Sequence, residues 1–386
     1  MEKKIKVLIS LGTRPEGIKM APVIKELQKN PQKFDIAVCS TGQHREMLGQ
    51  VTEFFEIIPD IELNVMTQGQ SLSMLSSKII GSMEEVFNKA APDIVLVQGD
   101  TTTAFLTAFI AFYQKIKIGH VEAGLRTYNK YSPFPEEINR QLVSKIADLH
   151  FAPTKNAYEN LKKEGIDEKS IILTGNTVVD AINWGINKIE NKSKDEIPAD
   201  IKYLSGLLEE DKKIILVTMH RRESFGNEII NVCNALKAVA QKYENINIVY
   251  PVHLNPNVTG PVGEILGNIK NIKLIKPLSY EPFLWLMNKS YFIITDSGGI
   301  QEEAPTLKKP VLVIRKFTER KESVEQGISK LVGTDMDAII SNASLLLDSE
   351  PEYKKMVADV NPYGDGKASE RIAASILNYF ENNGKP

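Results

Sequence analysis

Three acidic residues stand where β-rich runs end or where a helix begins, and positioned carboxylates of this kind are suited to proton transfer. Asp100 follows the run 94–97 in the motif Q-G-D-T-T-T, and Glu122 follows the next such run in G-H-V-E-A-G-L-R-T. Glu136 begins a helix after a proline-rich turn. A cleft can separate the pKa values of such groups into acid and base roles. Local alternatives stay open, since Asp100 also suits a helix N-cap and Glu136 an ion pair with Arg140.

A basic turn follows the first strand-like run. Residues 12–19 read G-T-R-P-E-G-I-K, with the glycine spacing of a P-loop. Ile18 and Lys19 replace the Lys-Ser/Thr pair that a P-loop requires, so we reject ATP binding by that mode. Arg14 at the turn and Lys19 about one helical turn later could both meet an anion. The alternative is a basic turn at the surface.

The stretch 291–305, Y-F-I-I-T-D-S-G-G-I-Q-E-E-A-P, combines a β-rich run, a loop of small residues and the start of a helix. The pattern favours an anion site, because the first N–H groups of a helix lack partners and the helix dipole favours negative charge. Glu302 and Glu303 come just after the proposed phosphate position and could accept hydrogen bonds from ribose hydroxyls. The alternative is an ordinary helix start whose acids complement the dipole.

A histidine beside two arginines follows the first strand-like run of the second half. His220, Arg221 and Arg222 lie in M-H-R-R-E-S-F-G, and guanidinium and imidazole N–H groups match the oxygens of phosphate. A charged turn is the alternative. His253 also follows a strand-like run.

Composition narrows the function classes. The chain has 386 residues, 42% hydrophobic and 25% charged, which are globular values and too many residues for one ordinary core. A net charge of −2 gives no electrostatic case for nucleic acid or an anionic membrane, and no apolar run reaches membrane-spanning length. The two cysteines, Cys39 and Cys233, suit buried thiols in a reducing cytosol. Neither C-x-x-C nor H-E-x-x-H spacing occurs, which removes the common zinc sites.

Strand-like and helical runs alternate along both halves, which predicts an α/β protein with parallel sheets covered by helices. The halves meet near residues 190–213, a polar and poorly periodic stretch that we expect to be a link plus a surface segment. Two doubly wound, Rossmann-like domains facing each other would place a cleft at the carboxyl ends of both sheets. The polar motifs above fall at those ends.

The ordered set of motifs resembles the non-hydrolysing UDP-N-acetylglucosamine 2-epimerases. It comprises G-T-R-P-E, G-D-T-T-T, H-V-E-A-G-L-R-T, P-E-E-x-N-R, G-N-T-V-V-D-A, H-R-R-E-S-F-G, D-S-G-G-I-Q-E-E-A-P and N-P-Y-G-D-G, over nearly the whole chain. The resemblance implies a glycosyltransferase-B type fold. It implies an N-terminal domain over residues 1–178 with the sugar and acid/base residues, a UDP-binding domain over 179–366, and a final helix over 367–386 that packs back on the first domain.

The implied reaction interconverts UDP-N-acetylglucosamine and UDP-N-acetylmannosamine by anti elimination of UDP through 2-acetamidoglucal and re-addition. The residues matched to catalysis are Asp100, Glu122, Glu136 and His220. Those matched to substrate binding are Arg14, Lys19, Arg140, Phe283, Ser297, Gly298, Gly299, Glu303 and Arg320. Neither a cofactor nor a metal is implied, and the family expectation is a cytoplasmic homodimer.

Some members of this family carry a second UDP-N-acetylglucosamine site that acts as an allosteric activator. The residues that resemble it are Gln43, Gln70, Glu136, Arg221 or Arg222, and His253. Three other readings stay open: a glycosyltransferase of the same fold that uses a UDP-sugar donor, a hydrolysing epimerase, and a non-catalytic UDP-sugar sensor. A sensor would need the residues that bind phosphate but not the three acidic residues, so the presence of all three acids argues against it.

Overall fold

The computed structural model describes residues 3–43, 45–67, 69–209, 211–219, 226–357 and 359–383. The chain divides into two compact units, of which unit 1 comprises Met1–Trp184 with Tyr363–Pro386 and unit 2 comprises Gly185–Pro362. The boundaries expected from the sequence lie after residues 178 and 366. Helix α7 (Thr177–Glu190) carries the chain from unit 1 into unit 2.

Unit 1 is built on a parallel sheet that, within the described residues, has seven strands in the order β3-β2-β1-β4-β5-β6-β7. Its strands are β1 (Ile5–Leu11), β2 (Phe34–Ser40), β3 (Ile61–Glu62), β4 (Ile94–Gln98), β5 (Lys117–Val121), β6 (Leu149–Ala152) and β7 (Ile171–Leu173). Its helices are α1 (Arg14–Gln28), α2 (Arg45–Phe54), α3 (Leu72–Ala90), α4 (Thr102–Tyr113), α5 (Glu136–Ile146), α6 (Lys155–Lys163), the 3-10 turn η1 (Glu168–Ser170), most of α7, and α16 (Ala368–Asn383).

Unit 2 contains a second parallel sheet, which in the described part of the chain has six strands in the order β10-β9-β8-β11-β12-β13. Its strands are β8 (Lys213–Thr218), β9 (Ile246–Pro251), β10 (Ile272–Ile275), β11 (Phe292–Thr295), β12 (Val311–Val313) and β13 (Ser329–Leu331). Its helices are α8 (Ala199–Leu207), α9 (Asn227–Lys242), α10 (Pro256–Leu266), α11 (Tyr280–Lys289), α12 (Gly298–Glu303), the 3-10 turn η3 (Ala304–Leu307), α13 (Lys321–Glu325), α14 (Met336–Asp348) and α15 (Glu350–Lys355). The predicted α/β class with two doubly wound sheets is confirmed.

Each sheet reverses its winding direction once, between β1 and β4 in unit 1 and between β8 and β11 in unit 2. Ligands of such folds bind beside the carboxyl ends of the strands that flank the reversal. In unit 1 these ends lead into the loop before α1 and into the Gly99-Asp100 turn. In unit 2 they lead into Met219 and into the Ser297 loop before α12. The strand order therefore brings together, inside each unit, motifs far apart in the sequence.

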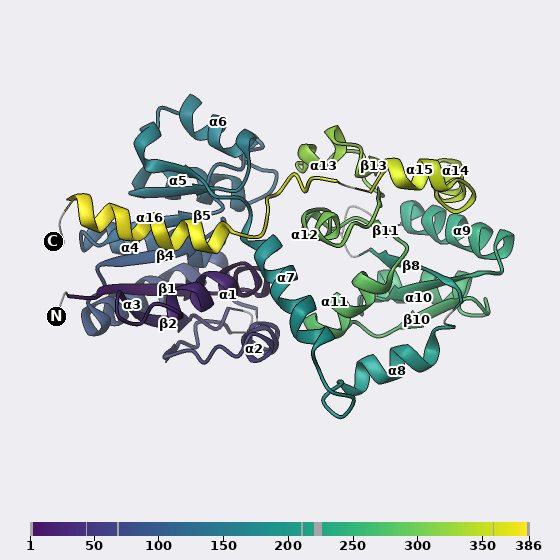
Figure 1. The fold of residues 1–386 in the computed structure, drawn as a ribbon, viewed down its shortest axis with the longest axis horizontal. Helices are drawn as coiled ribbons and strands as arrows, with labels where there is room; N and C mark the ends of the chain where they lie inside the picture. Colours follow the sequence, from purple (N-terminus) through teal and green to yellow (C-terminus); the bar gives the residue numbers. More distant parts are fainter. Residues whose placement is uncertain are drawn as a thin grey trace. The chain divides into compact units, whose positions relative to one another are not determined.

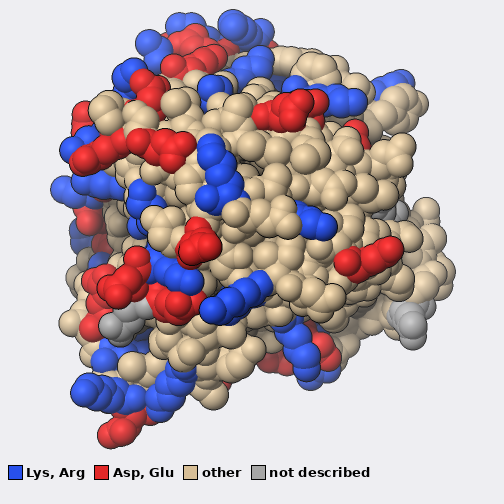
Figure 2. Space-filling model, turned by 90° about the vertical axis from the view of Figure 1, so that its right-hand side faces the viewer, with Lys and Arg blue, Asp and Glu red and all other residues tan. Residues whose placement is uncertain are grey.

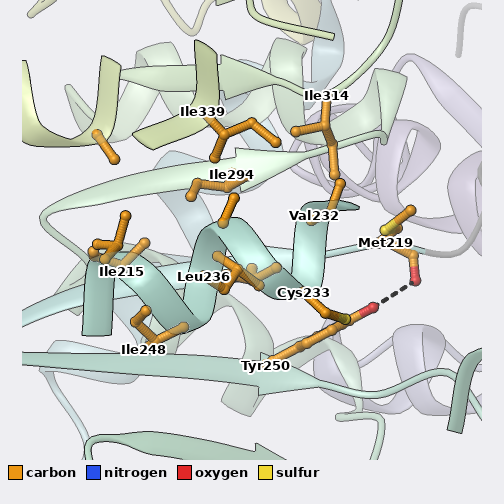
Figure 3. Close-up of a cluster of buried hydrophobic side chains, with 14 of the residues drawn as sticks. Ile215, Met219, Val232, Cys233, Leu236, Ile248, Tyr250, Ile294, Ile314 and Ile339 are labelled. Atoms are coloured by element: carbon orange, nitrogen blue, oxygen red, sulfur yellow. Dashed lines mark hydrogen bonds between the residues drawn. The ribbon is translucent and has the colours of Figure 1, made fainter. Parts of the chain in front are cut away.

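The strands of both sheets are mostly apolar, because helices cover the two faces of each sheet. In unit 2 the core joins β8, β9 and β11 to α9 and α14 (Figure 3). Tyr250 is fully buried there and donates its hydroxyl hydrogen to the carbonyl of Met219 at 3.5 Å. In unit 1 the equivalent core joins the strands to α3 and α4.

The final helix, α16 (yellow in Figure 1), belongs to unit 1 and packs on α1. Asp180 in α7 fixes the start of α16. Its carboxylate accepts hydrogen bonds from the backbone N–H groups of Ala368 and Ser369 and from the Ser369 hydroxyl. A carboxylate at a helix N-terminus satisfies N–H groups that would otherwise lack partners.

The stretch 190–213 is more ordered than its composition suggested. It contains α8, which buries Ile201 and Leu204 and packs on α11. Part of the expected link and surface segment is therefore a helix that packs on α11. Its two apolar anchors are too few to stand out in a polar sequence, and the contact with α11 is what orders the helix.

The face shown in Figure 2 carries lysine and arginine side chains interspersed with aspartate and glutamate, separated by uncharged surface. No extended basic area is visible on this face, in keeping with the net charge of −2. Among the described residues, no helix combines the length and the apolar character needed to cross a membrane.

Candidate active site

Glu122 is held in an unusual backbone conformation directly after β5. Its φ of 64° lies in the left-handed region, which non-glycine residues adopt rarely. The turn continues through Gly124, with φ of 93°, where a Cβ atom would come within 2.2 Å of the Ala157 carbonyl oxygen. Only glycine fits at position 124, because a side chain there would collide with the backbone of α6. The turn directs the Glu122 side chain into the protein, where it is 7% exposed.

The buried carboxylate of Glu122 is held by two side chains from elsewhere in unit 1. Lys19 of α1 places its Nζ 2.5 Å from Oε1, and Gln98 at the end of β4 donates its amide hydrogen to Oε2. Lys19 was predicted to meet a substrate anion. Here its ammonium meets Glu122, so its positive charge stabilises the negative charge of that carboxylate.

Asp100 lies in the turn after β4, two residues beyond Gln98. The alternative that Asp100 caps the following helix is wrong, because Thr101 is the N-cap of α4 and its Oγ1 accepts a hydrogen bond from the Ala104 N–H at 3.0 Å. The Asp100 carboxylate instead forms an ion pair with Arg140. Asn139 donates to the Asp100 carbonyl at 2.9 Å. Two neighbouring residues of α5 thus hold both the backbone and the side chain of Asp100.

Arg140 also contacts Glu137, with Nη1 3.5 Å from Oε2. The predicted local alternative was an ion pair of Arg140 with Glu136, and the structure places Glu137 in that role. Glu137 is fully buried, which acts to raise its pKa. Hydrogen bonds from the Thr127 N–H, the Gln141 amide and the Tyr128 N–H outweigh burial and hold the pKa of Glu137 below its ordinary value. Glu136 is half-buried at the first position of α5.

Glu16 is a buried carboxylate that the sequence analysis did not single out. Its Oε2 accepts hydrogen bonds from the Gly12 and Thr13 N–H groups and from the Thr13 hydroxyl. Its Oε1 accepts from the Thr101 hydroxyl at 2.9 Å, so Glu16 ties the loop after β1 to the loop after β4. Burial raises the pKa of Glu16 to about 7, although the hydrogen bonds lower it. The T-x-x-E spacing of a capping box was the signal that could have found it.

Arg14 occupies the first position of α1, half-buried, beside this loop. Gln43, one of the predicted allosteric residues, lies close by, since its Oε1 accepts a hydrogen bond from Thr103 in the first turn of α4 at 2.8 Å. Gln70, in the segment before α3, accepts hydrogen bonds from the Thr67 hydroxyl and from Lys78 of α3. His253 belongs to unit 2, is exposed after β9 and accepts from the Asn255 N–H at 3.2 Å. The grouping of these residues into one site stays a prediction.

In unit 2, the loop after β11 leads through Ser297, the N-cap residue, into α12. A Cβ atom on Gly298 would lie 3.1 Å from Cζ of Arg320, so glycine lets this guanidinium approach the start of the helix. Arg320 is held there by Glu302, with Nε 2.8 Å from Oε1, and by Glu319. A cation at a helix start together with unpaired N–H groups favours an anionic ligand.

The remaining predicted residues of unit 2 lie near this loop or outside the described chain. Glu303 ends α12 and is half-buried, with Oε1 3.9 Å from the position of a Cβ atom on Gly299. Phe283 is half-buried in the first turn of α11. His220, Arg221 and Arg222 lie outside the described residues, directly after Met219 at the end of the β8 segment. Among the described residues, His, Cys, Asp and Glu side chains form no group of three that could hold a metal ion.

The chain is similar over nearly its whole length to known proteins. A family model described as UDP-N-acetylglucosamine 2-epimerase matches residues 25–377. A UDP-N-acetylglucosamine 2-epimerase from Campylobacter jejuni is 53% identical over 98% of both chains.

The structure is similar to that of the Neisseria meningitidis UDP-GlcNAc 2-epimerase bound to UDP-GlcNAc, with a TM-score of 0.89, 47% identity and coverage of 97% of this chain and 100% of that one. It is also similar to the Methanocaldococcus jannaschii enzyme in complex with UDP-GlcNAc and UDP, with a TM-score of 0.79, 34% identity and the same coverage. These matches confirm the predicted glycosyltransferase-B-like fold. The chain belongs to the UDP-N-acetylglucosamine 2-epimerase family.

Proposed function

We propose that the protein interconverts UDP-N-acetylglucosamine and UDP-N-acetylmannosamine by eliminating UDP and adding it back. Family membership supports the overall reaction. The observation that carries the mechanism is the placement of Asp100 and Glu122. They directly follow the carboxyl ends of the adjacent strands β4 and β5. Each carboxylate forms an ion pair with a basic side chain, Asp100 with Arg140 and Glu122 with Lys19.

The chemistry requires a base for the proton on sugar carbon two and an acid to return a proton on the other face. As the C2–H bond breaks, its electron pair forms the C1–C2 double bond. The C1–O bond breaks at the same time, and its electron pair leaves with UDP, giving 2-acetamidoglucal. Re-addition reverses these steps after protonation from the opposite face. Inversion therefore needs carboxyl groups on both faces of the ring, and Asp100, Glu122 and Glu136 are the proposed set.

The surroundings of the two strand-end acids differ, which supports different roles for them. Glu122 is buried and meets an ammonium and a neutral amide. Asp100 is more exposed, with a 24% exposed side chain, and meets a guanidinium that it shares with Glu137. A basic side chain therefore lies beside each carboxylate, but the two sites differ in exposure and in the remaining hydrogen-bond partners.

The leaving UDP is proposed to lie at the loop before α12 of unit 2. Ser297, Gly298 and Gly299 would bind phosphate, with Arg320 offsetting the charge that develops as the glycosidic bond breaks. Glu303 would accept hydrogen bonds from the ribose, and Phe283 would lie near uracil. His220 would act near the diphosphate. Arg14 and Arg140 complete the proposed substrate contacts from unit 1.

Three finer features belong to the same proposal. A second UDP-N-acetylglucosamine molecule would act as an allosteric activator at Gln43, Gln70, Glu136, Arg221 or Arg222, and His253. The protein would work as a homodimer in the cytoplasm. Strictly hyperbolic kinetics, and no effect of UDP-N-acetylglucosamine on the reverse reaction, would refute the second site.

The deciding experiment follows UDP-N-acetylglucosamine with the purified protein in heavy water by proton NMR. We expect UDP-N-acetylmannosamine with deuterium at carbon two, because the proton removed there exchanges with solvent. Unexchanged substrate would refute the proposal in favour of a glycosyltransferase or a sensor. Free N-acetylmannosamine with UDP would indicate a hydrolysing enzyme.

A further inference from the structure

A buried histidine lies on β5, two residues before Glu122, and contacts the turn that carries Asp100. His120 is the fourth residue of β5 and pairs in register with Val97 of β4. Its side chain is fully buried, and its Nε2 lies 2.8 Å from the carbonyl oxygen of Gly99. A carbonyl oxygen only accepts hydrogen bonds, so Nε2 carries the hydrogen and donates it.

The ring is neutral and has one polar anchor. Burial lowers the pKa of His120 to about 3, and the nearby charges of Arg126 and Arg140 act in the same direction. Within the described residues, Nδ1 has no hydrogen-bond partner. An imidazole buried with one nitrogen unsatisfied is costly, and an apolar side chain would fill the space without that cost. The hydrogen bond to the Gly99 carbonyl is therefore the one contribution that histidine makes at this position and that an apolar side chain would lack.

The Gly99 carbonyl belongs to the turn that sets the position of Asp100. Gly99 has φ of 68°, and its N–H donates to the Val121 carbonyl at 2.9 Å. With the His120 bond, both polar groups of Gly99 are tied to β5. Asp100 comes one residue after Gly99, and Glu122 comes two residues after His120. The His120 side chain thus links the backbone of the turn that carries Asp100 to the strand that leads to Glu122. The turn and Glu122 are also close in space, since a Cβ atom on Gly99 would lie 3.5 Å from Oε2 of Glu122.

We propose that His120 is a positioning residue, which donates a hydrogen bond to the Gly99 carbonyl and thereby fixes the distance and orientation of Asp100 relative to Glu122. This inference rests on the acid/base roles proposed above for those two residues. His120 itself exchanges no proton with the substrate. Misplacing a reacting group by about 1 Å can cost about a hundredfold in rate, so a lost turn anchor should appear in turnover.

The chain offers a matched control on the neighbouring strand. His150 of β6 pairs in register with His120, is also buried, and also has its Nε2 on a backbone carbonyl, that of Ser144 at 2.9 Å. Its acceptor lies in α5, outside the Gly99 turn. Nδ1 of His150 also contacts the Ser170 hydroxyl at 3.3 Å, so replacing His150 removes a similar buried ring and at least as much hydrogen bonding, but only His120 holds the turn.

The test compares His120→Leu, His120→Gln, His120→Asn and His150→Leu in the intact protein, with kcat, KM and thermal unfolding measured for each. We expect His120→Leu to lower kcat by about 10- to 100-fold with little change in KM. Glutamine should restore most of the turnover, because its amide nitrogen reaches the Nε2 position, whereas the shorter asparagine should not. His150→Leu should lose thermal stability to a similar degree but keep its kcat. Because His120 stays neutral, the pH profile of kcat should keep its shape in all variants.

Three results would overturn the inference: wild-type kcat in a folded His120→Leu variant, equal kcat in the glutamine and asparagine variants, or an equal loss of kcat in His150→Leu. If the leucine variants fail to fold, the comparison of glutamine with asparagine decides. Asp100→Asn and Glu122→Gln are measured in the same assay. Normal turnover in those two would refute the proposed acid/base roles, whereas their inactivation beside a fully active His120→Leu would refute only the positioning role.

Discussion

Replacing Glu16 with glutamine should remove a pH dependence from the stability of unit 1. Glu16 is buried, and its pKa in the folded protein is raised from 4.5 to about 7. The folded state therefore holds a proton between these pH values that the unfolded state has already released. Under these conditions the free energy of unfolding falls as the pH rises, and the loss is complete above the folded pKa.

The magnitude follows from the size of the shift. A shift of about 2.5 pKa units at about 1.4 kcal/mol each corresponds to roughly 3 kcal/mol. For a unit of about 200 residues, each kcal/mol moves the melting temperature by about 2–4 °C. Between pH 4.5 and pH 8 the wild-type protein should therefore lose about 10 °C relative to Glu16→Gln. Glutamine keeps an acceptor for the Thr13 N–H, so the difference reports titration more than a lost hydrogen bond.

Thermal unfolding from pH 4.5 to pH 8, followed by circular dichroism, measures this difference. Glu26→Gln is the matched control, because it removes a negative charge from the same helix where Glu26 pairs with Lys29 at the surface. The control should follow the wild-type curve. Parallel curves for wild type and Glu16→Gln over the whole range would show that Glu16 is ionised in the folded protein and would refute the reasoning.

Three further predictions concern residues that closely follow β4, β5 and β11. Asp100→Asn and Glu122→Gln should each lower turnover by about a hundredfold or more in the heavy-water NMR assay, and near-normal rates in both would remove them from the proton-transfer set. Gly124→Ala should destabilise the protein by about 3 kcal/mol in denaturant unfolding, because φ of 93° and a carbonyl oxygen 2.2 Å from the new Cβ atom both oppose it, and an unchanged midpoint would contradict that geometry. Gly298→Ala should displace Arg320 and weaken UDP binding about tenfold by calorimetry, and unchanged affinity would place the diphosphate elsewhere.

Much of the fold was readable because parallel strands are short, apolar and end in polar turns. The run predicted at 94–97 is the strand Ile94–Gln98, and the final helix expected over 367–386 is Ala368–Asn383. The helix Ala199–Leu207 was missed, because its order comes from contact with another helix.

The candidate site was predictable at the level of motifs and less so at the level of partners. The choice between Glu136 and Glu137 as the partner of Arg140 depends on how α5 is rotated, which adjacent glutamates in a sequence do not reveal. The contact of Lys19 with Glu122 spans 103 residues and requires the strand order of the sheet. The grouping of the proposed allosteric residues stays a prediction.

The docking of α16 on unit 1 has a consequence for synthesis of the chain on the ribosome. Unit 2 is one continuous segment, Gly185–Pro362, and can fold as soon as that segment has emerged. Unit 1 also needs Tyr363–Pro386. The hydrogen bonds of Asp180 with the N–H groups of Ala368 and Ser369 can form only after that segment has been synthesised. The unit that is synthesised first is therefore the last to be completed, and a premature stop shortly before α16 would leave unit 2 intact while uncovering the α1 surface.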